Sequence, residues 1–433
     1  MTVTTSEPIS RLGLQLPFER ATLANGLKVV LHPDRSLPLV TVNLWYHVGS
    51  KNERPGRTGF AHLFEHMLFQ GSEHVPANEH FRYLQQVGGV ANGSTWFDRT
   101  NYFETLPAHQ LDLGLWLESD RMGFFLPALT QENLDTQRGV VMNERRQRVD
   151  NQPYGRATER LHELLYPGDH PYHWPVIGYM EDIAAATLEE VREFFRTYYA
   201  PNNAVLTLAG DLDPDAALKR VEAWFGEIPP GPPVPPVPAP LSPLGGEQRE
   251  VLEDDVSLPR IYMGFRAPAY GERGWYAADL LAGVLTGGKS SVLYRDLVYE
   301  RRIAQDVAVW VSPYEKVATF MIVSTAKPGI PAETVERAVL EHVERAASAP
   351  PEPADFERSR NRMLTELYSG LQKLDNRADL FSQFTTYFDD PAGVAAEADR
   401  YLEIAPRELA DYASRWMTEA ERVVVTVVPR KAS

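Results

Sequence analysis

A run of prolines near the midpoint of the chain most constrains how it can fold. Residues 229–243 read PPGPPVPPVPAPLSP. Because proline cannot donate a backbone hydrogen bond, this segment is expected to form a stiff polyproline II connector. The chain has 433 residues, more than one hydrophobic core usually serves. We therefore predict an N-terminal domain over residues 1–228, a linker over 229–248 and a C-terminal domain over 249–433.

The closing segments of the two halves resemble each other. Residues 187–211, TLEEVREFFRTYYAPNNAVLTLAGD, and residues 405–429, APRELADYASRWMTEAERVVVTVVP, both predict a helix, a turn and then a strand. Long helical patterns cover residues 130–149 and 353–374, while the predicted strands come in adjacent runs. This order favours an internal duplication and an α+β fold class over a doubly wound parallel sheet.

Composition excludes several kinds of partner. The chain carries 43 Lys and Arg against 59 Asp and Glu, a formal net charge of -16, without a basic stripe, so we expect no nucleic-acid partner. It has no run of about 18 apolar residues, so we expect no membrane span. The N-terminal sequence lacks the basic start and apolar run of a secretory signal. A cytoplasmic location is therefore expected, or a periplasmic or secreted one if a longer precursor was trimmed.

The segment TGFAHLFEHMLFQGS, residues 58–72, carries the residues most typical of a catalytic site. On a helix of 3.6 residues per turn, His62, Glu65 and His66 share one face, and the opposite face is apolar. Two imidazoles on neighbouring turns can bind one Zn²⁺, and a third protein ligand and a water complete a tetrahedral site. The chain has no cysteine, so the third ligand must be His, Asp or Glu. The pattern H-x-x-E-H is the inverted zincin motif.

The chain resembles the M16 (pitrilysin-like) zinc peptidases over nearly its whole length. The resemblance is carried by GFAHLFEHMLFQGS, NGSTWFDRTNYFETLP, QRGVVMNERRQ, YAPNNAVLTLAGD and, in the second half, GGKSSVLYRDLVYE. Among family members it is most similar to the zinc-bearing subunit of bacterial two-subunit enzymes. The resemblance implies two homologous α+β domains, each a mixed β-sheet with helices mainly on one face, with the zinc site in the N-terminal domain.

The resemblance also narrows the choice of the third metal ligand. From the residues alone, Glu104, Glu118, Glu132 and Glu144 are comparable candidates. Family members take this ligand from a glutamate in a later helix, and Glu144 within VVMNE matches that position. A second glutamate usually lies seven residues earlier, where this chain has Gln137. An amide can still donate and accept hydrogen bonds near the metal, but it supplies no charge.

Asn92, Gly93, Ser94 and Thr95 form the expected substrate-binding segment. Residues 92–105 alternate in a way typical of a strand, and in the family the matching strand is an open edge to which an extended peptide adds. Gly93 stands where alanine is usual. An ordinary sheet strand is the alternative interpretation of these residues.

The C-terminal half lacks one feature of active relatives. They use an arginine and a tyrosine, from that half or from a partner subunit, to hold substrate and polarise the scissile carbonyl, in a context like E-K-R-G-L-A-Y. The matching segment here is ERRIAQDV, residues 300–307, with Gln305 at the tyrosine position. The resemblance therefore implies a heterodimer with a homologous non-catalytic subunit that carries the Arg/Tyr pair. A homodimer is the alternative.

Together these expectations describe a zinc-dependent endopeptidase that acts on peptides. His62, His66 and Glu144 are the expected Zn²⁺ ligands, and Glu65 is the expected general base for a metal-activated water. The alternative is a non-catalytic scaffold or assembly subunit of the same fold, because several relatives in respiratory complexes keep the fold without hydrolysing peptides.

Overall fold

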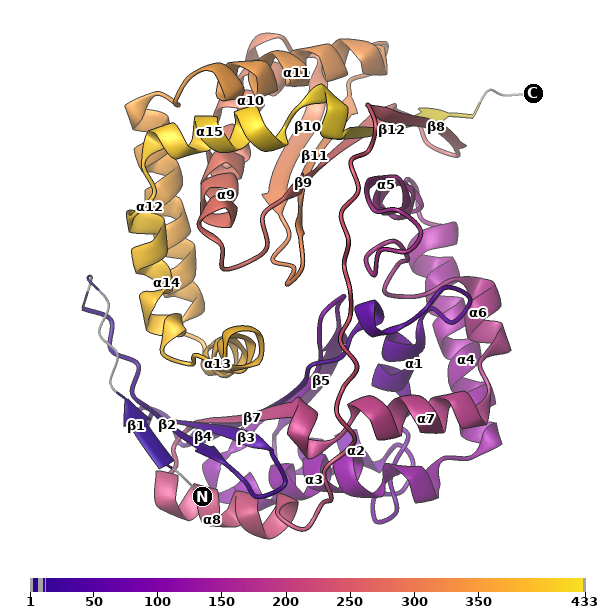
Figure 1. The fold of residues 1–433 in the computed structure, drawn as a ribbon, viewed down its shortest axis with the longest axis vertical. Coiled ribbons are helices and arrows are strands. Elements are labelled where there is room, and N and C mark those ends of the chain that lie inside the picture. The colour runs from indigo at the N-terminus through magenta and orange to yellow at the C-terminus, as the bar shows by residue number, and fades with distance from the viewer. Residues whose placement is uncertain (1–2, 7–10, 12, 431–433) are drawn as a thin grey trace. The chain divides into compact units, whose positions relative to one another are not determined.

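The computed structural model describes residues 3–6, 11 and 13–430. These residues divide by their contacts into two compact units (Figure 1). Unit 1 takes its residues from Met1–Glu144, Trp174–Val237 and Tyr368–Glu397, and unit 2 from Arg145–His173, Pro238–Leu367 and Ala398–Ser433. Residues 1–2 and 431–433, at the ends of the predicted domains, and residues 7–10 and 12 lie outside the described residues.

Unit 1 is built on a mixed β-sheet. Among the residues described, this sheet has seven strands in the order β1-β2-β3-β7-β4-β6-β5, and only β3 and β7 pair in parallel. The strands are β1 (Val3–Ser6), β2 (Phe18–Thr22), β3 (Lys28–Pro33), β4 (Leu39–Tyr46), β5 (Val90–Thr95), β6 (Thr100–Pro107) and β7 (Ala204–Gly210). Strand β5 therefore forms one edge of the sheet.

Helices lie mainly on one face of this sheet, as the resemblance implies, and α13 covers the other face. They are α1 (Phe60–Met67), α2 (Glu79–Gln86), α3 (Leu111–Ala128), α4 (Gln131–Arg145), α6 (Met180–Ala185), α7 (Leu188–Tyr198), α8 (Pro214–Phe225) and α13 (Leu374–Phe388), with short helical turns η1 (Ser50–Asn52), η2 (Ala108–Gln110) and η4 (Pro201–Asn203). Alternate residues of β4, Val42, Leu44 and Tyr46, are fully buried in a core shared with α1, α3, α7 and α8. This core fixes the face of the sheet on which the motif helix α1 lies.

Helix α13 covers the opposite face of the same sheet, although it comes from the second half of the sequence (Figure 1). The ring of Phe381 lies 5.6 Å from the ring of Phe18 and 5.2 Å from that of His32. The Ser382 hydroxyl donates a 2.8 Å hydrogen bond to the hydroxyl of Thr207. Phe381 thus packs against rings on β2 and β3, and Ser382 binds β7, so α13 is an integral part of unit 1.

Unit 2 repeats the central topology of unit 1. Within the described part of the chain its sheet has five strands in the order β8-β12-β9-β11-β10, with β8 and β12 parallel and the other pairs antiparallel. This is the order and orientation of β3-β7-β4-β6-β5. The strands are β8 (Gln248–Asp254), β9 (Arg260–Ala267), β10 (Ala304–Val311), β11 (Ala318–Ala326) and β12 (Arg422–Pro429). The structure thus confirms the duplication and the α+β class.

Unit 2 also has helices on both faces of its sheet. They are α5 (Ala157–Leu165), α9 (Arg273–Thr286), α10 (Val292–Tyr294), α11 (Ala332–Ser348), α12 (Pro353–Gly370) and α15 (Pro406–Trp416), with turns η3 (Arg146–Asp150), η5 (Arg295–Glu300) and η6 (Glu419–Glu421), and α14 (Gly393–Leu402) crosses the boundary between the units. Phe320 of β11 contacts Tyr412 of α15, with ring centroids 5.9 Å apart. On the other face Leu161 of α5 packs on Gly264 of β9, where a Cβ would lie 2.6 Å from Leu161 Cδ2.

The compact units therefore do not coincide with the predicted boundaries at 228 and 249. Each half of the sequence contributes one helix, α5 or α13, to the sheet that belongs mainly to the other half. The periodicity of these helices could not reveal this, because an apolar face does not specify which sheet buries it.

The long predicted helices are present with shifted ends. Residues 130–149 form α4 followed by the π-helical turn η3, and residues 353–374 form α12, which ends at Gly370. Residues 229–243 contain neither helix nor strand, and residue 248 already belongs to β8. No helix in the described ranges is both long enough and apolar enough to span a membrane.

A buried pair of carboxyl groups lies in the core of unit 1. Glu104 on β6 and Glu118 on α3 are both 0% exposed, and Arg121 Nη1 lies 3.1 Å from Glu118 Oε1. Burial, and next the negative charge of Glu118, raise the pKa of Glu104 well above its usual value. The carboxyl of Glu104 therefore keeps its proton in the folded chain at pH values where it would ionise in the unfolded chain.

Substituting the buried ring that α13 contributes should destabilise unit 1. Phe381 is 0% exposed, so Phe381→Ala should lower the free energy of unfolding by about 3–5 kcal/mol through lost transfer energy and a residual cavity. Asn376→Ala, at an exposed position of the same helix, is the control and should change it by less than about 0.5 kcal/mol. Urea unfolding followed by intrinsic fluorescence measures both, and equal effects would contradict the packing role of α13.

The protonated state of Glu104 predicts a pH dependence of stability. Since the folded chain binds a proton that the unfolded chain releases, stability should fall as pH rises above the unfolded pKa of about 4.5, by on the order of 1 kcal/mol per pH unit, until the higher folded pKa is reached. Glu104→Gln should flatten this slope and increase stability at pH 8. The exposed Glu132→Gln should leave the slope as in the wild type, measured by denaturant unfolding from pH 5 to 9. An unchanged slope in Glu104→Gln would exclude this assignment.

Candidate metal centre

Helix α1 presents the side chains of His62, Glu65 and His66 on one side because its other, apolar side is buried in the core. Leu63, Phe64 and Met67 are at most 1% exposed. Since side chains four residues apart share a face, the orientation that buries this apolar side places His62 and His66 together on the opposite side. Their ring centroids lie 4.8 Å apart.

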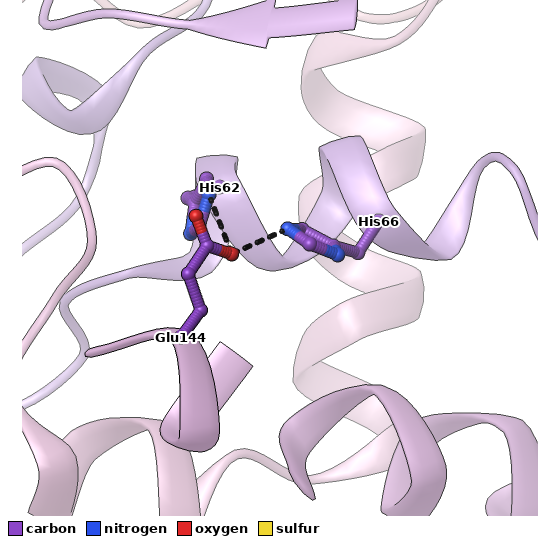
Figure 2. A group of neighbouring side chains, drawn as sticks. All are labelled: His62, His66 and Glu144. Carbon is purple, nitrogen blue, oxygen red and sulfur yellow. Dashed lines mark ion pairs between the residues drawn. The ribbon is translucent and has the colours of Figure 1, made fainter. Parts of the chain in front are cut away.

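Glu144 of helix α4 faces these two imidazoles, as Figure 2 shows. Its Oε2 atom lies 3.1 Å from His66 Nε2 and 3.8 Å from His62 Nε2. The three side chains are 11%, 24% and 15% exposed for His62, His66 and Glu144, so the point between them is shielded but reachable from solvent.

The donor set fits a zinc ion. One ligand atom from each of His62, His66 and Glu144 lies within 4.8 Å of the others. Ligands about 2.0–2.1 Å from a tetrahedral Zn²⁺ lie about 3.3 Å from one another, between the two distances measured to Glu144. Two imidazoles and one carboxylate from three protein residues, with a fourth position left open, are typical of catalytic rather than structural zinc sites.

The other glutamates that were candidates for the third ligand lie elsewhere. Glu104 and Glu118 form the buried carboxyl pair in the core. Glu132 is exposed in the first turn of α4, at the opposite end of that helix from Glu144. Within the described residues, the group that can hold a metal contains Glu144 and none of these three. The sequence left four glutamates open, and the packing of α4 against α1 selects among them.

Glu65 lies beside the metal group without belonging to it. Its carboxyl is largely buried, and burial raises its pKa, while a hydrogen bond with the Thr95 hydroxyl and the neighbouring His66 lower it. The carboxyl is thus on the same helix as both imidazoles and is held toward strand β5. A partly desolvated carboxylate next to a metal position is suited to accepting and returning a proton.

The four predicted substrate-binding residues all lie in edge strand β5, but they face different sides. A Cβ on Gly93 would lie 3.3 Å from Glu65 Cγ and 3.1 Å from Phe69 Cε2, so this residue faces α1. Ser94 faces away and donates a 2.7 Å hydrogen bond to Asn101 Oδ1. Thr95 returns to the α1 side, and Asn92, like Ser94, lies on the other side. The close contacts also give a reason for glycine at position 93.

Arg99 is a residue near the site that the sequence did not single out. Its Nη1 donates a 2.9 Å hydrogen bond to the Ser94 carbonyl. The guanidinium carbon lies 5.0 Å from the ring centre of Trp45 and 5.4 Å from that of Trp96. Arg99 therefore holds the end of the edge strand in place through a hydrogen bond and two cation–π contacts. An isolated arginine in a turn carries no periodic signal, so the sequence pattern could not reveal this role.

Gln137 and Gln305, which replace a glutamate and a tyrosine of the family pattern, lie in different units. Gln137 lies on α4 two turns before Glu144 and is 5% exposed. Gln305 is exposed on β10 of unit 2, where the pairing with β11 is irregular between Ala304 and Asp306.

Comparison with known proteins places this chain in a family. Residues 28–172 match a family model described as insulinase (peptidase family M16), and residues 185–363 match the model of the peptidase M16 inactive domain. A zinc protease PqqE of Helicobacter pylori is 29% identical over 415 residues, which cover 95% of this chain and 93% of that protein. An uncharacterised zinc protease YmxG of Bacillus subtilis is 26% identical over 298 residues, covering 69% of this chain and 71% of that one.

Solved structures share the whole fold. A protease from Helicobacter pylori superposes with a TM-score of 0.90 at 28% identity, covering 96% of this chain and 100% of that chain. A putative M16-like peptidase from Alicyclobacillus acidocaldarius shares the fold with a TM-score of 0.83 at 22% identity, covering 96% of this chain and 100% of that one. The two adjacent family models and these relatives together establish that this chain belongs to the M16 (pitrilysin-like) peptidase family.

Proposed function

We propose that this protein is a zinc-dependent endopeptidase. The observation that carries the proposal is the convergence of His62, His66 and Glu144, from two helices, on a single point. When bound, Zn²⁺ would supply Lewis acidity and lower the pKa of a coordinated water toward about 7. The zinc protease names of the relatives support the same metal and the same class of reaction.

The residues of the chain have distinct tasks in this proposal. His62 and His66 bind the metal through Nε2 as neutral imidazoles, and Glu144 binds it through an ionised carboxylate oxygen. Glu65 accepts a proton from the attacking water and returns it to the leaving amine nitrogen. Its contact with the Thr95 hydroxyl orients the carboxyl toward β5, which is where an extended substrate would lie.

Strand β5 is the proposed docking edge for the peptide. It ends the sheet of unit 1 within the described residues, so one row of its backbone N–H and C=O groups is left for an added strand. Because Gly93 lies against Glu65 Cγ, the backbone there approaches the proposed base closely. Main-chain hydrogen bonding at this edge would bring a scissile peptide bond beside Glu65 without requiring a particular side chain.

We further propose that a homologous, non-catalytic subunit completes the site. Gln305 occupies the position where active relatives have a tyrosine, so this chain does not supply that hydroxyl. The fold of the chain covers only 47% of the periplasmic protease PqqL of Escherichia coli, with a TM-score of 0.76 at 17% identity, and it also matches the separately solved first half of PqqL. An M16 architecture with two such halves is consistent with a partner chain here. A homodimer is the alternative arrangement.

A non-catalytic scaffold is the second candidate function. It is favoured by the family model over residues 185–363, described as an inactive domain, and by a Pseudomonas fluorescens structure named for that domain, with a TM-score of 0.85 at 17% identity over 96% of this chain and 98% of that one. The presence of His62, Glu65, His66 and Glu144 together argues for catalysis. A structural role does not require two imidazoles and a carboxylate that converge on one point.

Removing the proposed base should separate metal binding from catalysis. In Glu65→Gln we expect zinc content to remain near one ion per chain while hydrolysis of a quenched peptide falls by about 100-fold or more, because the amide cannot accept the proton. His62→Ala should lose both the metal and the activity. Atomic emission and fluorescence assays measure the two quantities. A fully active Glu65→Gln variant would exclude this mechanism, and a wild-type chain with neither zinc nor activity would favour the scaffold.

Activity should depend on the partner. The chain alone should bind zinc but cleave quenched peptides slowly, and co-purification with a homologous subunit that carries the Arg/Tyr pair should raise turnover by about 100-fold, the usual effect of one oxyanion-stabilising group. A partner variant with that tyrosine changed to phenylalanine is the matched control and should not raise turnover. Full activity of the chain alone as a monomer would contradict the partner proposal.

A further inference from the structure

Helix α1 begins without a cap from its own N-cap residue. Gly59 occupies that position with φ of 84°, in the left-handed region, and glycine has no side chain that could accept a hydrogen bond. The first backbone N–H groups of a helix have no partner within the helix and need an acceptor when they are buried. The start of α1 is buried, since Phe60 is 3% and Ala61 0% exposed.

The carboxyl oxygens of Glu53 supply these acceptors from outside the helix. Its Oε2 accepts a 2.9 Å hydrogen bond from the Gly59 N–H, and its Oε1 accepts a 2.8 Å bond from the Ala61 N–H. Burial raises the pKa of the Glu53 carboxyl well above its usual value, while hydrogen bonds from the backbone N–H groups of Ala61, Gly59 and Phe60 lower it. One side chain thus binds two backbone N–H groups at the start of the helix, one through each of its oxygens.

The backbone of Glu53 is itself held firmly. It follows turn η1, and its N–H donates a 3.1 Å hydrogen bond to the Ser50 carbonyl. The indole of Trp174 donates a 2.8 Å bond to that same carbonyl. Within η1, Lys51 pairs with Asp98 at 3.2 Å, and both side chains are at most 4% exposed. Glu53 therefore reaches α1 from a rigid support.

The other side of the helix start is equally restricted. Asp182 Oδ2 accepts hydrogen bonds from the Thr58 N–H at 3.1 Å and from the Thr58 hydroxyl at 2.7 Å. Gly178 lies so close that a Cβ there would be 2.4 Å from Gly59 Cα. With backbone against backbone on this side, the first turn of α1 has no room to shift toward Gly178.

His62 is the third residue of α1 and follows Ala61 directly, whereas Glu65 and His66 lie one turn further on. The position of the His62 imidazole relative to His66 and Glu144 therefore depends on the first turn. We infer that Glu53 is a positioning residue, whose carboxyl group holds the first turn of α1 so that His62 Nε2 meets the other two metal ligands. This inference rests on the proposed zinc function.

The test compares the loss of this cap with the loss of a cap elsewhere. In Glu53→Ala we expect the zinc dissociation constant, measured by chelator competition, to rise by about 10- to 100-fold, as is typical when a group that orients a metal ligand is removed. Asp213→Ala is the matched control. Its carboxylate accepts a 3.0 Å bond from the Ala216 N–H at the start of α8, which carries no site residue. It should lower the melting temperature but leave zinc affinity unchanged.

Glu53→Gln provides the second variant, should the alanine variant fold poorly. It keeps the size of the side chain but turns one acceptor oxygen into a donor that faces a backbone N–H, so zinc affinity should fall about threefold or more. The Co²⁺-substituted protein gives a further readout, because the visible absorption of the ion changes when His62 shifts. Zinc affinity and Co²⁺ spectra equal to those of the wild type in a folded Glu53 variant would overturn the positioning role and leave the peptidase proposal intact. Failure of the wild-type chain to bind zinc would overturn both.

Discussion

The candidate site depends on the burial of one side of helix α1. Phe64 stacks against the ring of Phe194 in α7 and against the ring of Tyr199, which follows that helix, with ring centroids 5.3 and 5.0 Å away. A helix of eight residues held this tightly has no freedom to rotate about its axis. The direction in which His62 and His66 point is therefore set by apolar packing on the opposite side, before any metal binds. Metal affinity and core stability are thus linked through one short helix.

The exchanged helices explain why two similar halves form one protein. If each half folded alone, the sheet face that α13 or α5 covers would lie open. On unit 1 that face carries Trp45, whose indole donates a 2.8 Å hydrogen bond to Asp379 of α13, and this carboxylate also accepts a 3.0 Å bond from Asn101 on β6. Since Asn101 also accepts a hydrogen bond from Ser94 on the edge strand, the second half of the sequence takes part in ordering the proposed peptide-binding edge.

The sequence predicts features that depend on residues close together in the chain, but not those that depend on contacts between distant segments. The shared face of His62, Glu65 and His66 follows from helical periodicity alone, and so does the order of helix and strand in each half. The identity of Glu144 does not, because it depends on how α4 packs against α1, and only the family resemblance pointed to it. The division of the chain into compact units differs from the predicted boundaries for the same reason. Glu53, which lies in no periodic relation to His62, left no pattern that could be read from the sequence.

Four glutamates of unit 1 show why residue type is a weaker guide to function than environment. Glu53 contacts backbone N–H groups and acts as a helix cap. Burial and the neighbouring Glu118 raise the pKa of Glu104, which favours its protonated form. Glu144, 15% exposed and facing two imidazoles, is placed to bind a cation. Glu65 differs from Glu144 in facing the Thr95 hydroxyl on an open strand edge rather than both imidazoles. Burial raises the pKa of this carboxyl, which suits it to accept and return a proton.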